Sequence, residues 1–224
     1  MTEALEQEMY TEAEAARLLR VPQSTLHYWL EGGERRGTVY KPVLRIEPRR
    51  SRTVSWAEFV EAALLREYRQ VKRIPMAELR AVIDQMREEF GVPYPLAHRP
   101  PFVSGRKLIY EAQVEAGLDP EFCLVAAVSG QYVLTAPSES FLERVVWEND
   151  VAAGWRPLAD ELSPIRIAPD VRFGRPAVDG ISTAVLWEQA EAGETVEELA
   201  RTYELTSRDV RWALTYESST PRAA

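Results

Sequence analysis

Two stretches of this chain carry the sequence signals that begin and end short helices, and they lie near its opposite ends. Thr11 and Glu14 have the spacing of a capping box, in which the Thr side chain accepts a hydrogen bond from a helix amide and the Glu reaches back. Thr195 and Glu198 repeat this spacing near the other end. The sequence therefore predicts a small helical module at each end of the chain.

The N-terminal signals outline a helix-turn-helix. Apolar residues between Ala15 and Leu19 give a first helix one buried face, and Pro22 suits the first turn of a second helix that ends at Gly32. This motif places its second helix in the major groove of DNA. The polar residues expected to face outward and to contact bases or phosphates are Gln23, Ser24, Thr25, His27 and Tyr28.

An Arg-rich segment follows, from residue 34 to 53. Its apolar residues lie around Pro42 and Pro48, and we interpret it as a short hairpin, or wing. A duplex backbone would lie beside such a wing, where guanidinium groups can bind phosphates. The arginines expected to contact phosphates are Arg35, Arg36, Arg49, Arg50 and Arg52.

The distribution of charge supports this interpretation better than the net charge does. The 224 residues carry a net charge of −8, which by itself disfavours a polyanionic partner. Between residues 17 and 52, however, nine basic and three acidic residues give +6 and leave −14 for the rest of the chain. A basic N-terminal module joined to an acidic remainder suits a protein that meets DNA at one face and a different partner elsewhere.

Two longer helices are expected next, over residues 57–71 and 76–90. Ser55, with Glu58 three residues later, caps the first helix, and Gly91 ends the second. Their apolar stripes are long for one small core, and two-fold operators are read by two-fold proteins. We therefore expect a homodimer with part of its seam on these helices, and we assign residues 1–91 to a winged helix-turn-helix domain with dimerisation helices.

The middle of the chain, residues 92–170, has a different character. Four prolines lie between residues 92 and 101, and the runs 102–111, 122–128 and 131–135 are typical of short strands separated by Gly-containing turns. A helix is expected over residues 138–147. The predicted fold class is therefore mainly α with a small β segment (α+β), and the β-rich middle forms a second domain.

The third predicted domain, residues 171–224, is helical again. Gly193 separates a first helix from a second, and Thr206 opens a third. The last helix is a candidate DNA reader that carries Ser207, Arg208 and Arg211 outward. Several glutamates crowd the same block, and acids beside a phosphate backbone are repulsive. A compact domain used for dimerisation or for a protein partner therefore remains open as the alternative.

Signals for catalysis and metal binding are weak. His27 and His98 have no Cys or second His at metal-ligand spacing, and the sequence has no Gly-rich phosphate loop and no nucleophile elbow. We expect no enzyme activity, no metal and no cofactor. Cys123 is a lone cysteine in an apolar run, which fits a reducing compartment. With no apolar run near the roughly 20 residues of a membrane span and no secretory signal, we expect a cytoplasmic protein.

The N-terminal residues carry a family resemblance. Residues 10–19 (YTEAEAARLL), Val21 and residues 24–29 (STLHYW) resemble the start of MerR-type winged helices. The resemblance covers about the first fifth of the chain. It implies a DNA-binding helix-turn-helix followed by a wing.

The C-terminal block resembles a second family. Residues 173–180 (FGRPAVDG), residues 192–200 (AGETVEELA) and Tyr203 are similar to the small antitoxin module known as DUF433. The resemblance implies a homeodomain-like fold of three helices for residues 171–224.

The two resemblances together point to antitoxins of the VapB type, whose partners are PIN-like RNases. They imply an antitoxin of a type II toxin–antitoxin pair that binds operator DNA as an autorepressor and neutralises an RNase toxin. Arg222, near the C-terminus, is the residue expected to enter the carboxylate site of the toxin. Two alternatives remain open: a stand-alone MerR-like regulator with a ligand-responsive middle domain, and an interaction scaffold that does not bind DNA.

Overall fold

The structure, a computed structural model, describes residues 5–35, 37–71 and 76–219 and divides into two compact units. Unit 1 runs to residue 143 and includes residues 147–152, whereas unit 2 contains residues 144–146 and the chain from residue 153 onward. Helices dominate, and the strands of the described residues form five two-stranded sheets. The prediction of a mainly α fold with small β elements (α+β) is confirmed. No helix in the described ranges has the length and apolarity that crossing a bilayer requires.

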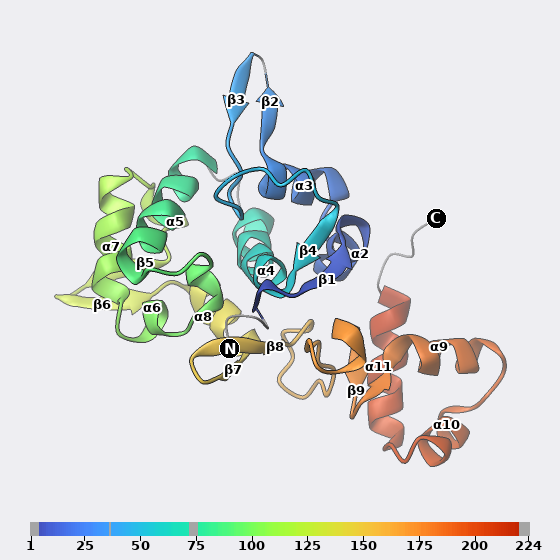
Figure 1. Ribbon diagram of the computed structural model, residues 1–224. Helices are drawn as coiled ribbons and strands as arrows, with labels where there is room; N and C mark the ends of the chain where they lie inside the picture. Colours follow the sequence, from blue (N-terminus) through green and yellow to red (C-terminus); the bar gives the residue numbers. More distant parts are fainter. Residues whose placement is uncertain (1–4, 36, 72–75, 220–224) are drawn as a thin grey trace. The chain divides into compact units, whose positions relative to one another are not determined.

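Unit 1 begins with the predicted pair of short helices (Figure 1). The Thr11 hydroxyl caps the first helix by accepting a hydrogen bond from the Glu14 amide at 3.2 Å, and Gly32 ends the second. The first and last strands of this region pair antiparallel. In chain order the elements are β1 (Glu8–Thr11), α2 (Glu12–Leu19), α3 (Gln23–Glu31), β2 (Gly33–Arg35), β3 (Thr38–Tyr40), β4 (Thr53–Ser55), α4 (Trp56–Val71) and α5 (Met76–Phe90).

Strands β2 and β3 form a hairpin that projects from the body of unit 1 (Figure 1). The predicted wing over residues 34–53 was too long, because the ladder ends at Tyr40 and residues 41–52 form a loop. Pro42 has no amide hydrogen to donate to a ladder. The next two amides, of Val43 and Leu44, both donate to the Trp29 carbonyl of α3. The loop is therefore bonded to the helix-turn-helix rather than to the hairpin.

Helix α4 forms the centre of unit 1. Every residue of α4 from Trp56 to Leu65 is buried, and the helix contacts α2, α3 and the short helix that follows α5. The Trp56 indole donates to the Ala152 carbonyl at 2.7 Å. On α5, the side chains of Leu79, Val82, Ile83 and Met86 are buried in the same way. The chain itself covers these buried side chains, so they are not free to form the predicted dimer seam, and the homodimer remains a prediction.

The middle of the chain combines helices and hairpins. Its elements are η1 (Pro95–Ala97), α6 (Pro100–Val103), α7 (Arg106–Glu115), η2 (Pro120–Phe122), β5 (Val125–Val128), β6 (Gln131–Leu134), α8 (Ala136–Arg144), β7 (Val145–Glu148) and β8 (Val151–Trp155). The predicted strands at 122–128 and 131–135 are present as the β5–β6 hairpin. The predicted helix at 138–147 begins two residues earlier and gives way to β7.

The strand predicted over residues 102–111 is wrong, because this stretch lies in α6 and α7. Ile109, Ala112 and Gln113 form the buried side of α7, with the three-to-four-residue spacing of a helix. The Gln113 side chain donates to the Val125 carbonyl and accepts from the Leu124 amide, so it also fixes the start of β5. The apolar content of the run was visible in the sequence, but its helical period was not recognised.

Unit 2 contains the three predicted C-terminal helices around one core. Its elements beyond β8 are η3 (Arg172–Gly174), β9 (Ala177–Val178), β10 (Ile181–Ser182), α9 (Thr183–Glu191), α10 (Val196–Thr202) and α11 (Ser207–Ser219). The predicted capping box opens α10, with the Glu198 carboxylate accepting from the Thr195 amide at 2.8 Å. The buried core residues are Ile165, Val178, Leu186, Leu199, Ala200, Val210, Ala213 and Tyr216. The division of the chain into three domains at residues 91 and 170 remains a prediction.

Candidate nucleic-acid interface

Helix α3 presents polar side chains to solvent, as predicted, with one exception. The side chains that are exposed or half-buried include Gln23, Ser24, His27 and Tyr28. The exception is Thr25, of which only 7% is exposed. It lies one turn before the buried Trp29 and therefore shares the inward side of the helix. The prediction that Thr25 faces outward is wrong.

The hairpin is tied to α3 at its base. The rings of Tyr28 and Tyr40 meet edge-on with centroids 6.3 Å apart. Gly32 lies directly under the hairpin with a φ of +70°, and a Cβ there would collide with the Tyr40 carbonyl oxygen. Glycine is needed at this position for both reasons, since L side chains disfavour this backbone conformation. The direction in which the hairpin leaves α3 thus depends on Gly32.

A buried arginine holds the loop of residues 41–52, which we call the Arg-rich loop. Arg45 donates through Nε to Glu58 at 2.8 Å, through Nη2 to the Thr53 carbonyl at 2.7 Å, and through Nη1 to Glu31. Burial alone would lower the pKa of Arg45, but its hydrogen bonds and ion pairs with the two glutamates outweigh burial and raise the pKa. Arg45 is therefore a structural cation that shapes the loop.

Helix α5 holds the same loop through two further arginines. Arg87 donates to the carbonyls of Val43 and Leu44 at 3.1 and 3.0 Å, and Arg80 donates to the Pro42 carbonyl at 2.8 Å. Carbonyls that would otherwise lack strand partners are satisfied by these guanidinium groups. The shape of the loop thus depends on residues about forty positions further along the chain.

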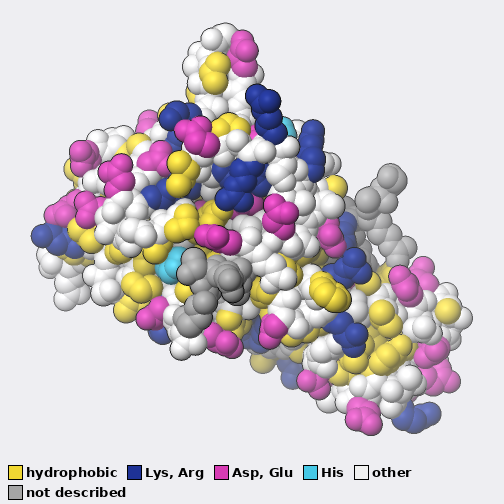
Figure 2. All heavy atoms as spheres, in the orientation of Figure 1, with side chains coloured by type: hydrophobic (Ala, Val, Ile, Leu, Met, Phe, Trp, Pro, Cys, Tyr) yellow, Lys and Arg dark blue, Asp and Glu magenta, His cyan; other side chains and the backbone are white. Residues whose placement is uncertain are grey.

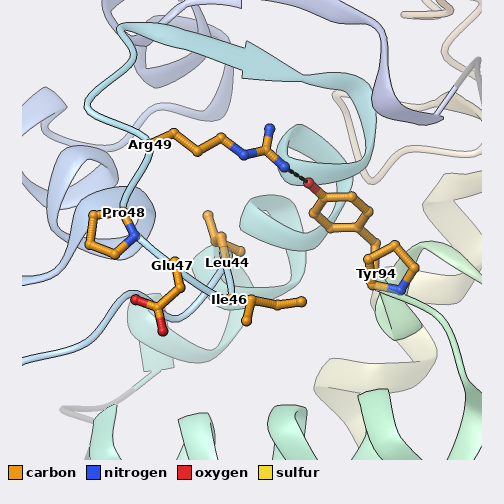
Figure 3. A pocket seen from close by; sticks show the side chains of 7 residues that line it. Leu44, Ile46, Glu47, Pro48, Arg49 and Tyr94 are labelled. Atoms are coloured by element: carbon orange, nitrogen blue, oxygen red, sulfur yellow. Dashed lines mark hydrogen bonds between the residues drawn. The ribbon is translucent and has the colours of Figure 1, made fainter.

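Arg49 is partly withdrawn from solvent, which the sequence did not predict. In Figure 3 its guanidinium extends toward Tyr94, and its Nη2 donates to the Tyr94 hydroxyl at 2.8 Å. Its Nη1 lies 3.4 Å from Oε1 of the buried Glu58. Burial, followed by the charge of Glu58, raises the pKa of Tyr94, so its hydroxyl keeps its proton and donates to Oε1 of Glu58 at 3.4 Å. The pair borders a hollow of about 200 Å³ that Leu44, Ile46, Glu47, Pro48 and Pro93 also line.

Two other predicted contact residues meet at a single buried carboxylate. Glu12, only 1% exposed, lies at the start of α2, with Oε1 2.9 Å from Nδ1 of His27 and Oε2 2.8 Å from Nη1 of Arg52. Its amide also donates to the Arg52 carbonyl at 2.9 Å. Glu12 lies between the capping residues Thr11 and Glu14, and no periodic signal in the sequence marks it as a partner of these residues.

A larger hollow, about 400 Å³, lies beside α3. Its lining residues are His27, Glu31, Gly32, Gly33, Pro48, Arg50, Ser51 and Arg52. Figure 2 shows Lys and Arg side chains gathered around the base of the hairpin. The Glu31 carboxylate also borders the hollow, but it accepts hydrogen bonds from Arg45 and from the Arg50 amide. Because these two donors compensate the negative charge of Glu31, the hollow suits an anion such as a phosphodiester.

A second buried acid, Glu61, belongs to helix α4. One of its oxygens accepts a hydrogen bond from the Leu96 amide at 2.9 Å, and the other is buried with no hydrogen-bond partner among the described residues. Burial raises the pKa of Glu61 to about 8, against the lowering influence of the Arg87 charge. The carboxyl group is therefore protonated near neutral pH.

The candidate residues of unit 2 lie on α11. Ser207 is half-buried, whereas Arg208 and Arg211 are exposed. Arg211 pairs with Glu197 of α10 across 3.4 Å, an exposed contact. Arg36 and Arg222 lie outside the described residues, and the main chain of Arg35 pairs with Thr38 in the hairpin. Among the described residues, no group of three or more His, Cys, Asp or Glu side chains could hold a metal ion.

The comparisons with known proteins agree with part of the sequence analysis. Residues 165–216 match the family described as "Protein of unknown function (DUF433)", which confirms the predicted resemblance for unit 2. This match spans β9, β10, α9, α10 and α11 as far as Tyr216. The MerR resemblance of the N-terminal residues is not shown by these comparisons and remains a prediction.

Two curated relatives come from Mycobacterium tuberculosis (strain ATCC 25618 / H37Rv). "Uncharacterized protein Rv2308" is 28% identical over 229 residues, which cover 96% of this chain and 92% of that protein. "Putative antitoxin VapB45" is 28% identical over 223 residues, 92% of each chain. The fold also resembles the X-ray crystal structure of Rv2018 from the same species, with a TM-score of 0.73 and 24% identity over 94% of this chain and 99% of that one.

Proposed function

We propose that this protein is the antitoxin of a type II toxin–antitoxin pair, which binds operator DNA as an autorepressor and neutralises a PIN-like RNase. The observation that carries the proposal is the similarity to "Putative antitoxin VapB45", because it extends over 92% of both chains and so includes both units. The proposal assigns no catalytic role to the protein and places it in the cytoplasm.

Unit 1 is the proposed DNA-binding part. Helix α3 carries the exposed polar residues that would meet base edges, and the loop beside it carries Arg50 and Arg52, which would meet the phosphate backbone. We further propose that the protein acts as a homodimer on a two-fold operator. Arg208 and Arg211 of α11 remain a second candidate for DNA contact.

Unit 2 is the proposed toxin-binding part. Its exposed acidic residues on and between α9 and α10 include Glu188, Glu191, Glu197 and Glu198. An RNase must present a basic surface to its substrate, and an acidic partner is complementary to such a surface. Arg222, outside the described residues, keeps its predicted role at the carboxylate site of the toxin.

A growth assay tests the proposal. The RNase gene adjacent to the gene of this protein is induced in a bacterial host, with and without the protein, and a reporter carries the shared promoter. We expect growth arrest by the RNase, relief by the protein, and lower reporter activity when the protein is present. An arrest that the protein does not relieve, or an adjacent gene that encodes no RNase, would contradict the antitoxin role.

The alternative role as a ligand-responsive regulator is favoured by one observation, the hollow beside Arg49 and Tyr94 (Figure 3). It pairs a guanidinium and a hydroxyl with apolar walls directly beneath the Arg-rich loop. A small carboxylate bound there would compete for Arg49 and so alter the loop. The regulator role predicts that small carboxylates shift promoter affinity and that Arg49→Gln removes this shift.

A further inference from the structure

We infer that Glu12 is a positioning residue of the DNA interface, which holds His27 and Arg52 side by side so that both donate to one backbone phosphate. The inference rests on the proposed operator binding by unit 1 and adds a residue that does not itself touch DNA. Its basis is the convergence of three separate chain segments, the start of α2, the middle of α3 and the end of the loop, on one carboxylate.

The burial of Glu12 makes this contact obligatory. A buried carboxylate is costly unless charged or hydrogen-bonding groups satisfy it, and the side chains that do so here are those of His27 and Arg52. These two contacts fix one nitrogen of each partner. The main-chain bond from the Glu12 amide to the Arg52 carbonyl holds the loop end against α2, so Arg52 cannot swing away with the loop.

The other nitrogens of His27 and Arg52 are available to bind a ligand. His27 has 40% and Arg52 73% of its side chain exposed, and both line the hollow beside α3. With Nδ1 of His27 directed at Glu12, the Nε2 edge points away from the carboxylate, and Nε2 donates to a phosphate when both ring nitrogens carry a proton. A phosphodiester offers two unesterified oxygens, which match one imidazole edge and one guanidinium edge. A planar base edge offers no such pair of charged acceptors.

A purely electrostatic role and a positioning role of Glu12 predict opposite changes in DNA affinity when its charge is removed. A carboxylate near a DNA backbone repels it, so removing the charge of Glu12 should tighten binding if Glu12 contributed only its charge. If Glu12 holds His27 and Arg52 in place, removing the charge should weaken binding instead. Glu8, four residues earlier on β1 and exposed, provides the control, because among the described residues its side chain forms no hydrogen bond or ion pair with either partner.

The test uses the full-length protein and a fluorescent duplex of its own promoter, with dissociation constants measured by anisotropy at several salt concentrations. We expect Glu12→Gln to weaken binding about 3- to 10-fold. It should also reduce the magnitude of the slope of log binding constant against log salt concentration by about one, which is the effect of losing one phosphate contact. Glu8→Gln should leave binding unchanged or tighten it. Circular dichroism verifies that each variant is folded, and Glu12→Gln is preferred to Glu12→Ala because it preserves volume.

A double-mutant cycle completes the test. Arg52→Ala should weaken binding in the wild-type background but have little further effect in the Glu12→Gln background, since the two residues act as one unit. Additive effects, or tighter binding by Glu12→Gln, would overturn the inference while leaving operator binding intact. Wild-type protein that does not distinguish its promoter from a scrambled duplex would overturn the proposed function itself, and the inference with it.

Discussion

Nε of Arg45 lies 2.8 Å from Oε1 of Glu58, and the two side chains are only 2% and 0% exposed. Glu31 is bonded to the same guanidinium from α3. One buried cation thus joins helix α3, the central helix α4 and the Arg-rich loop. The loop keeps its shape because breaking this junction would leave two carboxylates in the interior without their main partner.

Replacing Arg45 with Ala should therefore destabilise the protein strongly. Removing one partner of a buried ion pair typically costs about 3–5 kcal/mol, because the other charge is left uncompensated. Urea denaturation followed by circular dichroism measures the change. Lys41→Ala is the control, because Lys41 pairs with Glu47 at 3.8 Å on the surface, where such pairs contribute about 1 kcal/mol or less. Equal effects of the two variants would refute the structural role of Arg45.

Replacing Gly32 with Ala should displace the hairpin as well as lower stability. The variant has a strained backbone at φ +70° and a clash with the Tyr40 carbonyl oxygen, whereas Gly37→Ala at φ +77° has open space around its Cβ. Both variants should lose about 1 kcal/mol from the backbone alone, and Gly32→Ala should lose more. Thermal denaturation and amide NMR shifts of residues 33–40 measure these effects. Indistinguishable variants would mean that the hairpin base is not closely packed.

Glu61 should make stability depend on pH. The folded protein holds a proton at Glu61 up to about pH 8, whereas an exposed carboxyl releases it near 4.5. Between these values the folded state binds more protons, so the contribution of Glu61 to stability falls as pH rises. Glu61→Gln should remove this fall, and its stability relative to wild type should rise with pH by at most about 1.4 kcal/mol per unit.

Unfolding free energies of wild type and Glu61→Gln at pH 5, 6, 7 and 8 give the comparison. Glu89→Gln, which removes an exposed carboxyl on α5, is the matched control for the lost charge. A difference between wild type and Glu61→Gln that stays constant across this range would show that Glu61 titrates alike in the folded and unfolded chain.

Much of the local structure could be predicted from the sequence because its signals are short-range. The capping patterns at Thr11, Ser55 and Thr195 and the stop at Gly32 depend on residues within one helical turn. The helices they mark are present. Thr25 was placed on the wrong side of α3 because polarity was followed in preference to its position one turn before Trp29.

The buried ion pairs and hydrogen bonds that hold the candidate site could not be predicted, because they join residues that are far apart in the sequence. Glu12 meets Arg52 from 40 positions away, and Arg87 reaches Leu44 from 43 positions away. A charged residue in a sequence is usually interpreted as exposed, so burial of Glu12, Glu58 and Arg45 had no local signal. For the same reason Arg49 and Arg52 were expected to be free for phosphate, whereas both already pair with buried acids.

Promoter binding by paired charge-reversal variants tests the central claim most directly. Arg50 lies exposed beside α3 and Arg208 lies exposed on α11, so Arg50→Glu and Arg208→Glu place the same change on each unit. Anisotropy titrations with the protein's own promoter should show a loss of tenfold or more for Arg50→Glu, of the order expected for a repulsive charge at a phosphate contact, and a much smaller change for Arg208→Glu. Undiminished binding by Arg50→Glu, with loss by Arg208→Glu, would contradict the assignment of DNA binding to unit 1.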